Sequence, residues 1–123
     1  MAYIVVIDDD PKILEIFKLF LENEGHSVVT ANNGQEGIDI FRNDQADLVV
    51  TDMVMPVKNG LKTIMELGTE FPDIKIIAIS GGGIIEPDRY LSLAKCIGIK
   101  QTLTKPVTKE QLINAVNEVL EIP

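Results

Sequence analysis

The chain has 123 residues, a length that suits one domain, and 46% of them are hydrophobic, which is enough for a real core. Its 19 acidic and 11 basic residues give a net charge of −8. This charge argues against a nucleic-acid-binding module, because such a module needs basic surface to neutralise phosphates.

Nothing in the sequence points to a membrane or to secretion. No apolar run approaches the roughly 20 residues needed to cross a bilayer. The first residues, MAYIVVIDDD, have no basic start and reach acids early, so they are not typical of a signal peptide. A single cysteine, Cys96, excludes an internal disulfide and fits a reducing compartment. We therefore expect a cytoplasmic protein with no membrane partner.

The first predicted strand covers residues 3–8, a short apolar run rich in β-branched residues. The pattern then changes to that of an amphipathic helix. Asp10 is the expected N-cap of this helix, Pro11 suits its first position, and Gly25 suits its C-terminal end.

The rest of the chain repeats this alternation of strand and helix. A capping box of Thr108 and Gln111 is expected to open the last helix. Gly60 is expected to permit a turn before the third helix. The remaining predicted strands are 27–31, 47–52, 74–80 and 101–104, and the remaining predicted helices are 33–42, one from 60, 87–97 and one from 109.

Five strand–helix units in series predict one α/β domain over residues 1–123, with a doubly wound, five-stranded parallel sheet, five helices and flavodoxin-like topology. The strands read as continuous apolar runs, as expected for strands buried on both faces. In such sheets the ligand site lies outside the carboxyl ends of the strands, near the point where the winding switches direction.

Polar residues follow several predicted strands at this edge. Asp8 and Asp9 end the first strand, Asp52 ends the third, Ser80 ends the fourth and Lys105 follows the fifth. Three converging carboxylates repel one another and attract a cation. Mg²⁺ beside a phosphate is usually held by a small number of carboxylates. A lysine and a hydroxyl at the same rim would complement phosphoryl oxygens.

Each of these residues also has a simpler interpretation. Asp8 or Asp9 could be turn residues, Ser80 could simply end a strand, and Lys105 could be a surface lysine. Asp10 is interpreted only as a helix cap and is excluded from the site. We interpret His26 as an ordinary packing or surface residue and Cys96 as a core residue. The case for a site rests on the five positions occurring together at strand ends.

Four stretches together resemble one known family, the receiver domain of bacterial two-component response regulators, and the resemblance covers residues 2–121. VVIDDDPKIL resembles the acidic pair of that family, and VVTDMVMPVKNG resembles its phosphoacceptor loop. IIAISG resembles its hydroxyl switch strand, and TLTKPV its lysine–proline turn.

The resemblance implies a signalling protein that is not an enzyme. Asp52 would accept a phosphoryl group from a sensor histidine kinase or a phosphotransfer protein. Asp8, Asp9, Asp52 and the main-chain carbonyl of Val54 would hold Mg²⁺. Lys105 and Ser80 would contact the phosphoryl group, with a cis peptide between Lys105 and Pro106.

Two positions depart from the family pattern. Thr102 stands where the family usually has Tyr or Phe, and Val107 stands where it often has Phe. The aromatic side chain at the first position normally changes rotamer with phosphorylation. Thr102 is therefore a candidate output switch whose mechanism must differ from that of an aromatic ring.

Three other functions fit parts of the sequence less well. A hydrolase of the haloacid dehalogenase type also uses an aspartate nucleophile after a strand, but its phosphatases carry a second aspartate where this chain has Val54. A flavodoxin-like cofactor binder would want a Ser/Thr-rich phosphate loop where this chain has DDDPK. An unphosphorylatable adaptor is disfavoured because all five site positions are filled.

Overall fold

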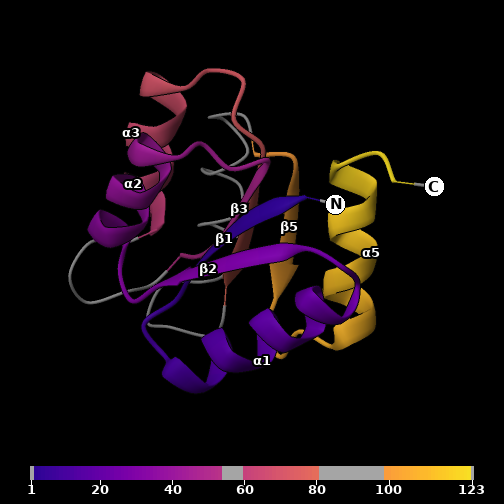
Figure 1. Ribbon diagram of the computed structural model, residues 1–123. Helices are drawn as coiled ribbons and strands as arrows, with labels where there is room; N and C mark the ends of the chain where they lie inside the picture. The colour runs from indigo at the N-terminus through magenta and orange to yellow at the C-terminus, as the bar shows by residue number, and fades with distance from the viewer. Residues whose placement is uncertain (1, 54–59, 81–98, 123) are drawn as a thin grey trace.

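The computed structural model describes residues 2–53, 60–80 and 99–122. Five parallel strands form one sheet in the order β2-β1-β3-β4-β5 (Figure 1). The strands are β1 (Tyr3–Ile7), β2 (Ser27–Ala31), β3 (Leu48–Asp52), β4 (Ile76–Ser80) and β5 (Gln101–Thr104). This strand order confirms the predicted flavodoxin-like topology.

Four helices are described, where the sequence predicted five. They are α1 (Pro11–Asn23), α2 (Gly34–Asn43), α3 (Gly60–Glu70) and α5 (Lys109–Val119). The expected count of five does not hold for the described residues, because the predicted helix at 87–97 lies outside them.

The helices cover both faces of the sheet, α1 and α5 on one side and α2 and α3 on the other (Figure 1). Each face has its own core. The helix residues that pack on the first face are Leu14, Phe17, Leu112 and Val116. Those that pack on the second face are Ile38, Phe41, Ile64 and Leu67. All of β3 and β4 is buried, which explains why these strands are apolar on both faces.

Side-chain capping contacts stabilise the predicted N-terminal ends of the helices. The Asp10 side chain accepts a hydrogen bond from the Lys12 amide at 2.9 Å, so its interpretation as a cap is confirmed. Thr108 and Gln111 form a complete capping box at the start of α5. Gly25 follows α1 with a φ of 92°, a conformation that favours glycine.

Two predicted strands begin later than expected, and the strand predicted at 47–52 begins one residue late, at Leu48. The strand predicted at 74–80 begins at Ile76, because Ile74 instead donates its amide hydrogen to the carbonyl of Phe71 in a turn after α3. Of the two interpretations of His26, packing or surface, the structure shows packing: the residue is buried, and its Nδ1 atom accepts a hydrogen bond from the amide of Ala2 at 3.2 Å. The predicted Cys96 packing lies outside the described residues.

Candidate functional site

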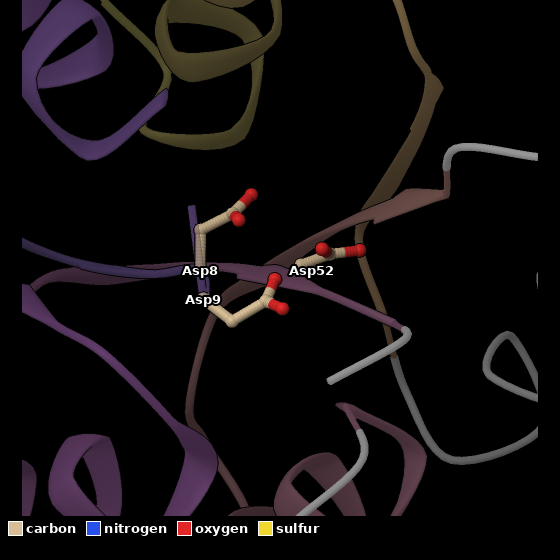
Figure 2. A group of neighbouring side chains, drawn as sticks. All are labelled: Asp8, Asp9 and Asp52. Carbon is tan, nitrogen blue, oxygen red and sulfur yellow. The ribbon is translucent and has the colours of Figure 1, made fainter. Parts of the chain in front are cut away.

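Three aspartates from two adjacent strands meet at the carboxyl edge of the sheet. Asp8 and Asp9 follow β1 and Asp52 ends β3, and these strands pair directly, with Ile7 opposite Thr51. Each aspartate offers an oxygen atom within 4.8 Å of the others (Figure 2). We call Asp8, Asp9 and Asp52 the acidic cluster. Because β2 and β3 flank β1 on opposite sides, the cluster lies where the winding switches direction.

The cluster is mostly shielded from solvent. Asp8 is 2% exposed and Asp52 is 5% exposed, whereas Asp9 is exposed. Buried carboxylates need partners, because a lone charge in the interior is strongly unfavourable. One partner of Asp8 is local, since its Oδ1 atom accepts a hydrogen bond from the amide of Asp10 at 2.9 Å.

Lys105 bridges the two buried carboxylates. Its Nζ atom lies 3.1 Å from Oδ2 of Asp8 and 3.2 Å from Oδ2 of Asp52. The lysine follows β5, which is two strands away from β3 in the sheet. The main chain anchors it, because the amide of Lys105 donates to the carbonyl of Ser80 at 2.6 Å. The peptide between Lys105 and Pro106 is cis, as predicted.

Burial and charge act against each other in this group. Burial is the largest effect on Asp8 and raises the pKa of its carboxyl group, and the negative charge of Asp52 raises it further. The hydrogen bond from the Asp10 amide and the positive charge of Lys105 act in the opposite direction. Burial alone would lower the pKa of Lys105, but the charges of Asp52 and Asp8 outweigh that effect and raise it. Lys105 therefore stays protonated at neutral pH and offsets part of the repulsion between the carboxylates.

The acidic cluster has the chemistry of a magnesium site. With all groups ionised, three carboxylates and one ammonium leave a charge of −2, so a divalent cation would neutralise the group. Mg²⁺ prefers oxygen ligands, takes few carboxylates and keeps several waters. The residues therefore fit this ion. The predicted fourth ligand, the carbonyl of Val54, lies outside the described residues.

The other predicted site residues lie at different depths in the sheet. Ser80 ends β4, is 2% exposed, and stands beside the strand of Asp52, where Ile79 is the register partner of Asp52. Thr102 lies opposite Ala78 inside β5, two residues before the end of the strand. The structure therefore brings Ser80 to the edge but leaves Thr102 within the sheet.

Thr51 was interpreted from the sequence only as a strand residue. Its side chain is fully buried, and its hydroxyl donates a hydrogen bond to the carbonyl oxygen of Asp52 at 3.1 Å. The available signal was a hydroxyl inside an otherwise apolar run, because a buried polar group requires a partner.

The raised pKa of Asp8 predicts a pH effect in metal-free buffer. The folded chain binds this proton more tightly than the unfolded chain, so ionisation of Asp8 lowers stability as pH rises through its raised pKa. Asp8→Asn should therefore be more stable than wild type at neutral pH. This advantage should shrink as pH falls through the raised pKa. Urea unfolding with a chelator, from neutral pH to about pH 5, measures the difference; a constant difference would contradict it.

Comparison with known proteins agrees with this geometry. The sequence model of the family described as "Response regulator receiver domain" matches residues 4–117. The transcriptional regulatory protein GlrR of Escherichia coli is 35% identical over 120 residues, which are 98% of this chain and 26% of GlrR. The protein PilH of Pseudomonas aeruginosa is 36% identical over 124 residues and is matched over 98% of both chains. This chain thus spans about a quarter of one relative and nearly all of the other.

Solved structures show the same likeness. A crystal structure of a response regulator receiver domain protein from Clostridium thermocellum has a TM-score of 0.91 and 35% identity, covering 98% of this chain and 95% of that one. Within the described residues, each helix is too short or too polar to cross a membrane. The chain belongs to the response regulator receiver domain family, in which phosphorylation and phosphorelay signalling are typical.

Proposed function

We propose that residues 1–123 form one receiver domain that accepts a phosphoryl group on Asp52 in a Mg²⁺-dependent reaction. The donor is a phosphohistidine of a sensor kinase or a phosphotransfer protein. One observation carries this proposal. The Asp52 carboxylate ends a buried strand inside the acidic cluster and contacts Lys105 at 3.2 Å.

The chemistry follows from this arrangement. A carboxylate oxygen of Asp52 attacks phosphorus and forms a P–O bond, while the P–N bond of the donor breaks and the imidazole nitrogen keeps the electron pair. Phosphoryl transfer needs positioning and charge neutralisation more than covalent help from the protein. Asp8, Asp9, Asp52 and the carbonyl of Val54 would hold Mg²⁺, which would supply that neutralisation.

Lys105 and Ser80 bind the phosphoryl group after its transfer to Asp52. On phosphorylation, the ammonium of Lys105 turns from the two carboxylates to the phosphoryl oxygens, with which it forms charge-assisted hydrogen bonds. Ser80 donates its hydroxyl to the same group. Since the carbonyl of Ser80 already accepts the amide of Lys105, the two residues respond together.

The output of this domain is a change in binding to a protein partner. The new charge at Asp52 biases a two-state element through Ser80, and Thr102 is the candidate output switch. We take the partner to be a protein and the site of action to be the cytoplasm. A net charge of −8 makes direct binding to nucleic acid unfavourable, and the domain signals without being an enzyme.

Labelling with radioactive acetyl phosphate tests the proposal. With Mg²⁺, the chain should take up one phosphoryl group, and hydroxylamine should release it, as expected for an acyl phosphate. With a chelator, labelling should fall to background, because the repulsion in the acidic cluster is then not neutralised. Labelling that is independent of Mg²⁺, or resistant to hydroxylamine, would contradict the assignment.

A further inference from the structure

We propose that Thr51 and Gly60 are positioning residues for Asp52. Acting from the α3 side of the sheet, they fix the peptide unit between Asp52 and Met53, and with it the direction of the Asp52 carboxylate. This inference rests on the proposed role of Asp52 as phosphoacceptor and adds two residues that act through it without contacting the phosphoryl group.

The first contact is a buried hydrogen bond. Thr51 faces the α2 and α3 side, since its register partners Ile7 and Ala78 both belong to that core. Its hydroxyl donates to the carbonyl oxygen of Asp52 at 3.1 Å. Because the side chain is fully buried, water cannot replace this bond if the hydroxyl is removed.

The second contact is a close approach that requires glycine. Gly60 is the buried first residue of α3, and a Cβ atom there would lie 2.6 Å from Cα of Met53 and 2.9 Å from the carbonyl carbon of Asp52. It would lie closer still to the carbonyl oxygen of Asp52. All three are backbone atoms, which have no rotamer with which to move aside.

This close approach adds a second reason for glycine at position 60. The sequence suggested that glycine permits a turn before the helix. That turn, at residues 54–59, lies outside the described residues, and the close approach is by itself a reason for glycine at this position. Its amide also donates to the carbonyl of Met53 at 3.1 Å, so the start of α3 is joined to the end of β3.

The two contacts hold one peptide unit from two sides. On its other edge, the amide of Met53 donates to the carbonyl of Ile79 in β4 at 2.8 Å. The backbone next to the phosphoacceptor is thus fixed by β4, by the Thr51 hydroxyl and by α3. Small errors in the position of a reacting group lower the reaction rate strongly, since a shift of about 1 Å can slow a reaction by about 100-fold.

The experiment compares four variants by their labelling rate with acetyl phosphate and by urea unfolding. Thr51→Val removes the hydroxyl and keeps the branched shape, and should slow labelling about tenfold. Thr51→Ser restores the hydroxyl, and should label within about twofold of wild type. Gly60→Ala should slow labelling between about tenfold and 100-fold, because the backbone of Asp52 must shift.

Gly37→Ala is the matched control. Gly37 is also a buried helical glycine, but the atoms nearest to a Cβ there belong to side chains, Cγ1 of Ile7 at 2.7 Å and Cβ of Ala31 at 3.7 Å among them. This variant should lose stability while labelling within about threefold of wild type. A fall in rate that follows stability across all variants, Gly37→Ala included, would reduce Thr51 and Gly60 to ordinary structural residues and overturn the inference.

The outcomes separate the two proposals. A folded wild-type chain that takes no label overturns the proposed function, and this inference with it. A wild-type chain that labels at Asp52, together with a Thr51→Val variant that labels equally fast, overturns this inference alone. If Gly60→Ala does not fold, the comparison of Thr51→Val with Thr51→Ser decides the matter, because rescue by serine depends on the hydroxyl.

Discussion

Replacing Asp52 with asparagine should abolish phosphorylation while leaving the fold intact. Asparagine has nearly the same shape, but its neutral amide is not a nucleophile toward phosphorus. The change removes one negative charge from the acidic cluster and also one of the two carboxylates that contact Lys105. These effects oppose each other, so the free energy of unfolding in metal-free buffer should change by no more than about 1 kcal/mol.

Asp47 supplies the control for this experiment. It lies just before β3, at the opposite end of the same strand, where its Oδ2 atom accepts a hydrogen bond from the amide of Tyr3 at 2.8 Å. Asp47→Asn keeps an acceptor oxygen there and should label at the wild-type rate. If Asp52→Asn takes up label as fast as Asp47→Asn, Asp52 is not the phosphoacceptor.

The sequence predicted the central strands well because β1, β3 and β4 are almost wholly buried. Runs such as Leu48–Val50 have no polar residue to obscure them, and the first and last helices have clear caps at Asp10 and Thr108. Parallel strands place their carboxyl ends at one edge, so the convergence of Asp8, Asp9 and Asp52 follows from topology.

The contacts across the edge were harder to predict. The sequence placed Lys105 near the site, but it did not show that the ammonium group lies between Asp8 and Asp52. That position depends on how far the side chain reaches across two strands. The close approach at Gly60 could not be predicted, because a close approach between two backbones leaves no local signal that differs from that of a turn. The hydroxyl contact of Thr51 is hard to predict for a similar reason, since threonine is also a common strand residue.

Replacing Lys105 with methionine should have the second large effect, and it should depend on metal. Methionine keeps an unbranched chain but leaves Asp8 and Asp52 without their shared cation. Removing one partner of a fully buried ion pair costs about 3–5 kcal/mol. Since the Lys105 side chain is 25% exposed, we expect a loss of about 2 kcal/mol in metal-free buffer. The melting temperature should fall by about 8 °C.

Saturating Mg²⁺ should restore most of the stability lost in Lys105→Met, because the ion neutralises the same carboxylates that the ammonium neutralised. The Mg²⁺ dissociation constant should also fall several-fold, since the ion no longer competes with a bound ammonium. Labelling by acetyl phosphate should nevertheless slow by at least about tenfold, because no cation from the protein then faces the phosphoryl oxygens. Lys109→Met, an exposed change four residues on, should alter none of these quantities. Equal losses of stability with and without Mg²⁺ would show that Lys105 acts through the packing of its side chain and not through the charge it shares with Asp8 and Asp52.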